Sequence, residues 1–305
     1  MTFPVLVFGP GGSVGNAAAI EAHKRGAKVY LAMRDTSKEA NGIQEGGKED
    51  GYVRVQADLS QPDTIKHAVE ISKAEAAFVY TVHGMQDHMR SAFEALKAAG
   101  ISYIVLLSTF RVREPPSSEA NMQNTIGAIH AKAEMALQGT GVPYTAVRPA
   151  YFNTNVLWGL EGIKKGRVEL IYPNARFDYL APADIGAVCG ALLAEPQLRL
   201  DAGQSIYLCG PDLMTQSEAH STIARTLGRE IQIVEIDEQT WFSRLQHMPR
   251  PLLEDLAHDL KENSGGRDLY GGIYEQAVRN VATYSGREAT RLGAWVEANA
   301  GVFAS

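Results

Sequence analysis

The first 150 residues alternate short branched apolar runs with helical patterns, and this alternation constrains the fold more than any other feature. Such a rhythm is typical of parallel strands joined by helical crossovers. Several helical patterns end at a glycine, such as Gly26 or Gly100, where a left-handed cap is expected. The pattern predicts an α/β fold with a doubly wound parallel sheet. Its six strands are expected at Pro4 to Phe8, Lys28 to Met33, Tyr52 to Ala57, Ala76 to Val82, Ile101 to Leu107 and Tyr144 to Val147.

The rhythm loosens after residue 150, where two further helix starts are recognisable. One follows Pro182, and the other is a capping box formed by Thr215 and Glu218. The polar, glycine-containing segment Glu262 to Arg267 is expected to be a mobile surface loop. We therefore expect a first domain over residues 1–150 and a smaller, mostly helical region over 151–305 that is interleaved with the sheet. Strand-like runs at Ser205 to Leu208 and Glu230 to Glu235 flank the second helix.

Composition narrows the class of partner. The chain has 29 basic and 35 acidic residues, a net charge of -6, which argues against a surface for duplex nucleic acid or anionic lipid. Its two cysteines, Cys189 and Cys209, form no CxxC pair, and His83 and His88 do not share a helical face, so no disulfide scaffold or metal site is expected. Without an apolar stretch of roughly 20 residues or a basic leader, we expect a soluble cytoplasmic protein with a small-molecule substrate.

The strongest chemical signal is the glycine turn that starts at Gly9, directly after the first strand, and opens the first helix. Its spacing is GxxGxxG through Gly9, Gly12 and Gly15, because Val14 occupies the last place of a GxGxxG reading. Gly9 permits the tight exit, Gly12 lets backbone approach a phosphate, and Gly15 lets the helix pack on the sheet. An ordinary turn is the alternative. The predicted dinucleotide contacts are Gly9, Gly11, Gly12, Ser13, Val14 and Gly15.

The end of the second strand selects between the two nicotinamide cofactors. An acid there binds the ribose hydroxyls of NAD, whereas an arginine accommodates the extra phosphate of NADP. Arg34 is the first residue after Met33, and Lys38 supplies a second cation, so we predict NADP, with NAD and a solvated Arg34 as alternatives. Asp58, with Leu59 beside it, follows the third strand. Its carboxylate is placed either to reach the adenine or to cap the helix near Pro62.

A tyrosine and a lysine four apart, the proton-donating pair of many short-chain dehydrogenases, are missing here. Lys132 occupies the place of the lysine, but Ala128 stands four residues before it. Lys132 is our catalytic candidate, as a ribose ligand or proton donor, against the alternative of a solvated lysine. His130 lies about 200° away around the helix and is expected to point off the same site.

Ligands of open parallel sheets lie outside the carboxyl ends of the strands. Backbone near Thr81 and Val82, together with Ser108, is therefore expected to line the nicotinamide ribose. A histidine at this edge is an acid candidate, although a surface histidine is the alternative. Aromatic side chains suit a planar acceptor, and core packing is their alternative role. The candidate substrate contacts are His83, Phe110, Tyr151, Phe152 and Trp158.

Taken in order, these motifs resemble the NmrA-like family of atypical short-chain dehydrogenases/reductases over nearly the whole chain. The resemblance rests on the glycine turn, on Arg34 to Lys38, on Asp58-Leu59, and on Lys132 and Glu134 ahead of the run from Gly141 to Pro149. It continues through Phe152 to Asn155, Tyr179 to Gly186 and Gly210 to Thr215. The resemblance implies an NADP-binding Rossmann domain and a smaller C-terminal part that covers the substrate.

The resemblance implies two different activities. Some members reduce quinones, enones, imines or aromatic ethers, and in one subgroup the lysine matching Lys132 is catalytic. Others bind dinucleotide without turnover and report redox state to a partner protein. Pro10 and the run from Ser108 to Arg111 depart from the reductase pattern. We expect an NADPH-dependent reductase of a small conjugated or carbonyl-like compound, with a non-catalytic redox sensor as the alternative.

Overall fold

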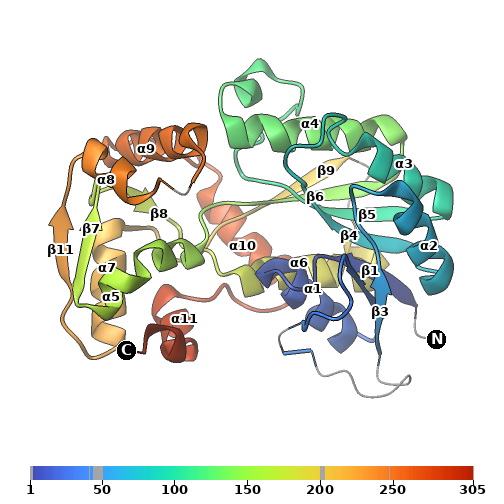
Figure 1. The fold of residues 1–305 in the computed structure, drawn as a ribbon, viewed down its shortest axis with the longest axis horizontal. Helices are drawn as coiled ribbons and strands as arrows, with labels where there is room; N and C mark the ends of the chain where they lie inside the picture. The colour runs from blue at the N-terminus through green and yellow to red at the C-terminus, as the bar shows by residue number, and fades with distance from the viewer. Residues whose placement is uncertain (1–2, 41, 44–50, 200–202, 247, 305) are drawn as a thin grey trace. The chain divides into compact units, whose positions relative to one another are not determined.

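A seven-stranded parallel sheet organises the first of two units in the computed structural model, which describes residues 3–40, 42–43, 51–199, 203–246 and 248–304 (Figure 1). The strand order is β3-β2-β1-β4-β5-β6-β9, so the order reverses between β1 and β4. The predicted doubly wound fold is confirmed. The strands are β1 (Pro4–Phe8), β2 (Lys28–Met33), β3 (Tyr52–Gln56), β4 (Ala76–Tyr80), β5 (Tyr103–Leu107), β6 (Tyr144–Pro149) and β9 (Gln204–Leu208).

The seventh strand was not assigned to the sheet from sequence. The run around Ser205 was interpreted only as a flank of the following helix, but β9 pairs in parallel with β6, Val147 opposite Ile206. Its crossover runs through α6, which begins at Pro182 as expected. Unit 1 therefore comprises residues 1–149, 182–208 and 280–287, and the remainder of the chain forms unit 2.

Helices cover both faces of this sheet (Figure 1). On one face α1 and α6 cross so closely that a Cβ on Gly186 would lie 2.3 Å from Ala17 Cβ, and a Cβ on Gly190 would lie 2.7 Å from the Ala18 carbonyl oxygen. Small residues at this crossing let the two backbones approach. The helices of unit 1 are α1 (Ser13–Lys24), α2 (Pro62–Ser72), α3 (Arg90–Ala99), α4 (Thr125–Thr140) and α6 (Pro182–Ala194), with short turns η1 (Glu119–Met122) and η3 (Pro196–Leu198).

Unit 2 is mostly helical and contains two small sheets, with β8 antiparallel to β10 and β7 parallel to β11. Its core gathers aliphatic and aromatic side chains from most of its elements. The elements are η2 (Asn153–Gly159), α5 (Leu160–Lys164), β7 (Arg167–Leu170), β8 (Arg176–Phe177), β10 (Met214–Thr215), α7 (Gln216–Thr226), β11 (Gln232–Glu235), α8 (Glu238–Arg244), α9 (Arg250–Ser264), α11 (Leu292–Ala298) and η4 (Ala300–Phe303); α10 (Tyr274–Ser285) belongs partly to each unit.

The capping box at Thr215 is present: its hydroxyl accepts from the Glu218 amide at 3.0 Å, and Glu218 accepts from the Thr215 amide at 2.7 Å. The expected loop at 262–267 is partly wrong, because α9 continues through Ser264. Leu253, Ala257 and Leu260 are buried at helical spacing and anchor the helix. Its last turn is polar, so in the sequence that turn resembles a loop.

Candidate functional site

The glycine turn has the geometry that its spacing predicts. Gly9 has φ +68°, a conformation that favours glycine, and its carbonyl accepts the Gly12 amide at 3.0 Å. A Cβ on Gly15 would lie 2.4 Å from the Gly9 carbonyl oxygen, so the entry of α1 requires glycine there. A Cβ on Gly12 would meet that oxygen only at 3.5 Å, and one on Gly11 would meet nothing within 4 Å. The protein itself therefore leaves room beside Gly11 and Gly12.

The first turn of α1 presents free donors. The amides of Ser13, Val14 and Gly15 make no hydrogen bond to any described part of the chain, and no side chain caps the helix at Gly12. Asn16 closes the turn from inside, because its side chain donates to the Pro10 carbonyl at 3.1 Å. Unpaired amides at the positive end of a helix dipole form a site for a phosphate anion. The site fits a dinucleotide pyrophosphate.

At the end of β2, the neighbouring side chains of Arg34 and Asp35 differ in whether they have hydrogen-bond partners. The Asp35 carboxylate accepts from the Ser37 hydroxyl at 2.6 Å and the Ser37 amide at 3.0 Å, bonds that lower its pKa. Arg34 and Lys38 are exposed, and neither side chain forms a hydrogen bond or ion pair within the described residues, although the charge of Lys38 acts on Asp35. The carboxylate that would bind the ribose of NAD is thus engaged in its own turn, whereas the cations suited to a phosphate are available.

The other predicted cofactor contacts already take part in hydrogen bonds or core packing within the protein. Asp58 accepts from the Ser60 amide and hydroxyl, both at 2.8 Å, and Leu59 is buried in the core. The cap of α2 is Gln61, so the alternative role of Asp58 as a helix cap is wrong. The Thr81 hydroxyl donates to the Leu107 carbonyl at 3.3 Å and the Val82 amide to Met89 sulfur at 3.1 Å.

Ser108 belongs to a buried polar cluster that sequence reasoning did not identify. Its hydroxyl donates to Glu134, which forms an ion pair with Arg148 at 2.6 Å, both side chains being 1% exposed. Arg148 also reaches Glu114 at 2.7 Å and the Tyr207 hydroxyl at 2.7 Å. The cluster ties β5, α4, β6 and β9 together. Glu134 and Arg148 stand in the family motifs, but only the fold shows that they pair.

On α4, the structure brings His130 into contact with His83, three residues beyond the end of β4. The rings of His130 and His83 meet edge to face with centroids 5.9 Å apart. Lys132 is half-buried and forms no hydrogen bond or ion pair with the described chain. His130 was set aside in the sequence analysis because it leaves the helix about 200° from Lys132. The contact of His130 with His83 was not predicted from the sequence, and the role of Lys132 stays a prediction.

The predicted aromatic contacts fall in both units. In unit 1, Phe110 is buried and packs edge to face on Tyr207, so its ring is part of the core. In unit 2, Tyr151 stacks on Phe177 with centroids 4.0 Å apart. Phe152 is the N-cap residue of η2, and Trp158 is 50% exposed.

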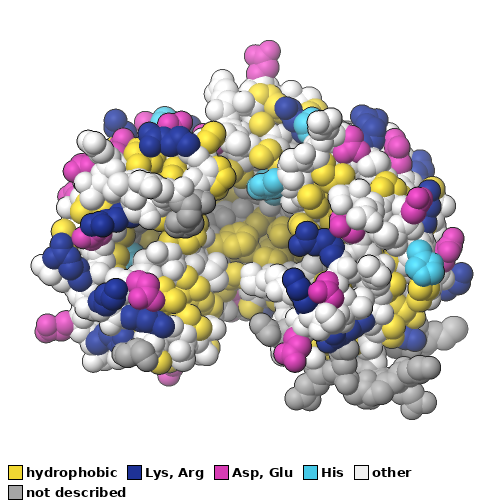
Figure 2. All heavy atoms as spheres, viewed as in Figure 1, with side chains coloured by type: hydrophobic (Ala, Val, Ile, Leu, Met, Phe, Trp, Pro, Cys, Tyr) yellow, Lys and Arg dark blue, Asp and Glu magenta, His cyan; other side chains and the backbone are white. Residues whose placement is uncertain are grey.

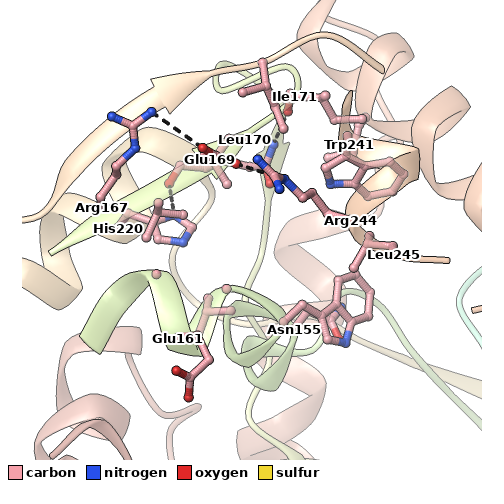
Figure 3. Close-up of a pocket in the computed structure, with 18 of the residues that line it drawn as sticks. Asn155, Glu161, Arg167, Glu169, Leu170, Ile171, His220, Trp241, Arg244 and Leu245 are labelled. Carbon is pink, nitrogen blue, oxygen red and sulfur yellow. Dashed lines mark hydrogen bonds and ion pairs between the residues drawn. The ribbon is translucent and has the colours of Figure 1, made fainter. Parts of the chain in front are cut away.

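A pocket of about 610 Å³ lies within unit 2 (Figure 3). Tyr151 and Trp158 are among the residues that line it. Glu169 on its wall pairs with Arg167 and with Arg244, each at 3.5 Å. His220 is buried beside it, and its Nδ1 lies 2.8 Å from the Gln216 carbonyl oxygen. Further walls come from Tyr179, Trp241, Leu245 and Leu260. These residues span more than 100 positions, so their spacing in sequence gave no signal of the pocket.

Three findings bear on the partners and ligands of the chain. On the face shown in Figure 2, basic and acidic side chains are interspersed, without a large area of one sign. No helix in the described part of the chain is long and apolar enough to cross a membrane. Within the same residues, no three His, Cys, Asp or Glu side chains are grouped as metal ligands would be.

Comparison with known proteins places this geometry in a family. Residues 9–196 match the NAD(P)H-binding family. A nitrogen metabolite regulation-like protein of Gibberella fujikuroi is 35% identical, over 96% of this chain and 95% of that protein. The chain belongs to the NAD(P)H-binding family. Within it, the predicted NmrA-like membership is confirmed, and at the level of the family so is the nicotinamide cofactor.

Other proteins similar to this chain are named as enzymes. An NAD(P)H azoreductase of Xenophilus azovorans is 23% identical, over 98% of this chain and 99% of that protein. Among solved structures, an NADPH-dependent quinone oxidoreductase of Escherichia coli complexed with NADPH superposes with a TM-score of 0.75 at 18% identity, over 96% of this chain and 99% of that chain. At that identity the likeness concerns the fold.

Proposed function

We propose that this chain is an NADPH-dependent reductase that delivers hydride to a small conjugated or carbonyl-like acceptor such as a quinone, enone or imine. The observation that carries the proposal is the set of unpaired amides at Ser13, Val14 and Gly15, together with the exposed, unpaired Arg34. These groups would hold the pyrophosphate and the 2′-phosphate. When bound, NADPH supplies the hydride. Lys132, whose ammonium has no described partner, would hold the nicotinamide ribose.

The pocket of unit 2 is the proposed acceptor site. Its aromatic walls, Tyr151, Trp158, Tyr179 and Trp241, suit a flat conjugated molecule, and its volume of about 610 Å³ is in the range of small-ligand sites. Burial raises the pKa of Tyr151 well above its usual value, so its hydroxyl stays protonated and remains a hydrogen-bond donor at neutral pH.

The test is turnover. Purified protein with NADPH is offered quinones, enones and cyclic iminium compounds, and loss of NADPH absorbance is followed. We expect at least one class to be reduced, Lys132→Ala to raise the KM for NADPH, and Trp158→Ala to raise the KM for the acceptor with little change for NADPH. Tight NADPH binding without turnover of any acceptor would contradict the proposal.

One observation favours a second function, a redox sensor that regulates a partner protein. The relative that is 35% identical is named for nitrogen metabolite regulation rather than for a reaction. A sensor would bind NADP and NADPH with different affinities and would not consume either. Equilibrium titration with both forms, together with the turnover assay, separates the two functions.

A further inference from the structure

Two histidines from distant parts of unit 1 meet at one strand end. His83 lies three residues beyond Tyr80, the last residue of β4, and His130 lies in the second turn of α4. Their ring planes are nearly perpendicular, at 89°, with the centroids 5.9 Å apart. The two residues are 47 positions apart in the sequence, and neither belongs to any motif discussed above.

The meeting point lies beside the glycine turn. The sheet order reverses between β1 and β4, and ligands of such sheets bind outside the strand ends at that reversal. Tyr80 packs against the turn so closely that a Cβ on Gly9 would lie 2.7 Å from its ring. The segment that carries His83 therefore leaves β4 next to the segment that carries the phosphate-binding amides.

The two imidazoles differ in environment. His130 Nδ1 is buried and has no hydrogen-bond partner. A buried polar atom without a partner costs folding free energy, and an apolar side chain of similar size would not incur that cost. Burial, followed by the adjacent His83, lowers the pKa of His130 to about 3, so its ring is neutral. His83 is exposed, and within the described chain its nitrogens bond to nothing. The carboxylate of the same loop, Asp87, is engaged by the Met89 and Ser91 amides.

Lys132 leaves α4 about 200° from His130, and its proposed role is at the nicotinamide ribose. Glu134, on the same face as His130, is held by Arg148. Of the ionisable side chains named here, His83 is the one that is exposed, has unpartnered nitrogens within the described chain and contacts His130.

We propose that His83 donates the proton that completes reduction of a neutral acceptor, and that His130 is the positioning residue that holds the His83 ring. The inference rests on the proposed reductase function. Hydride addition to the acceptor carbon forms a C–H bond and leaves an electron pair on the acceptor oxygen. The His83 imidazolium gives that oxygen its proton, forming O–H, and water reprotonates the ring. Each turnover consumes one NADPH and one proton.

The experiment compares acceptors that need this proton with one that does not. A quinone or enone requires hydride and a proton, whereas an N,N-dialkyl iminium cation becomes a neutral amine on hydride addition alone. We expect His83→Asn to lower kcat with the neutral acceptors by about 100-fold and with the iminium by less than about 3-fold. Added imidazole should restore part of the lost rate. His88→Asn is the matched control, an exposed histidine of the same loop with φ +53°, which asparagine tolerates.

The positioning role has its own readout. His130→Ala should lower the ratio of neutral-acceptor to iminium turnover about 5-fold, and His130→Phe, which keeps an edge-to-face ring, should restore that ratio. NADPH affinity, measured by fluorescence titration, should be the same in all variants. Equal losses with both acceptor classes, or no rescue by imidazole where only neutral acceptors are reduced, would overturn the assignment of His83. A wild type that reduces nothing would instead overturn the reductase function, and this inference with it.

Discussion

Arg34 is the residue on which the choice between NADP and NAD depends. It is exposed after β2 without a described partner, while the neighbouring Asp35 carboxylate is held by Ser37. We predict that Arg34→Ala raises the Kd of NADPH at least 10-fold, because a charge-assisted contact contributes about 1.5 to 3 kcal/mol. The Kd of NADH should change less than 2-fold. Calorimetric titration of both cofactors measures this, and equal losses would remove the basis for NADP.

Asp178 is a buried carboxylate of unit 2 whose ionisation affects stability. It accepts from the Gly210 amide at 2.7 Å, the Tyr151 amide at 2.9 Å and the Tyr270 hydroxyl at 3.0 Å. Desolvation nevertheless raises its pKa from 3.8 to about 6. The folded chain therefore binds this proton more tightly than the unfolded chain. The resulting stability is present below about pH 4 and is lost as pH rises through about 6.

We predict that the free energy of unfolding of the wild type, relative to Asp178→Asn, falls by up to about 3 kcal/mol between pH 4 and pH 7. Urea unfolding at several pH values measures the difference. Asp237→Asn is the control, since hydrogen bonds from Thr240 lower the pKa of Asp237, and its stabilising contribution is lost as pH falls. Two difference curves of the same slope would refute the prediction.

At the scale of elements, the turn between β1 and α1 contains one glycine that the fold requires and another that leaves room for the phosphate. A Cβ on Gly15 would overlap the Gly9 carbonyl at 2.4 Å, while a Cβ on Gly12 would make an ordinary contact at 3.5 Å. We predict that Gly15→Ala destabilises unit 1 by about 1 to 3 kcal/mol. Gly12→Ala should leave the melting temperature unchanged and weaken NADPH binding at least 10-fold, because its methyl group occupies the path to the phosphate. Thermal unfolding and titration of both variants test this. Normal NADPH affinity in Gly12→Ala would contradict the phosphate site.

The pairing of β6 with β9 shows what an element contributes beyond its own residues. Arg148 bonds both to Glu134 on α4 and to Tyr207 on β9, so it links α4 to a strand about 70 residues later in the chain. Breaking a buried ion pair from one side leaves a charge without compensation, so the cluster holds α4 in one rotation against the sheet. That rotation also places His130 at the end of β4.

At the scale of the whole molecule, the two units have different ligands in this proposal. We predict that NADPH slows hydrogen exchange in unit 1, at residues 9–16 and 34–38, and that a non-reducible flat aromatic acceptor analogue slows it in unit 2, at 155–171 and 241–245. Bound ligand lowers local opening in proportion to occupancy. Mass-spectrometric exchange with each ligand alone measures both effects. Protection of the unit 2 segments by NADPH alone, with none at the glycine turn, would reverse the assignment.

Much of the fold is predictable from the sequence because its information is local. Apolar runs, helix ends and the spacing of Gly9, Gly12 and Gly15 each depend on neighbouring residues, so the six strands, the turn and the exposed Arg34 follow from periodicity and turn chemistry. The capping box at Thr215 is recognisable for the same reason. These features were sufficient to indicate a nicotinamide dinucleotide.

Only the tertiary structure decided which distant side chains meet. The seventh strand, the Glu134–Arg148 pair, the contact of His83 with His130 and the pocket that joins Trp158 to Trp241 all depend on strand order and helix rotation. A shift of two positions on a helix turns a side chain through about 200°, so the contact of His130 with His83 depends on how the fold rotates that helix. Sequence alone determined the ligand class through short-range geometry, and the fold determined the groups at the strand ends through long-range packing.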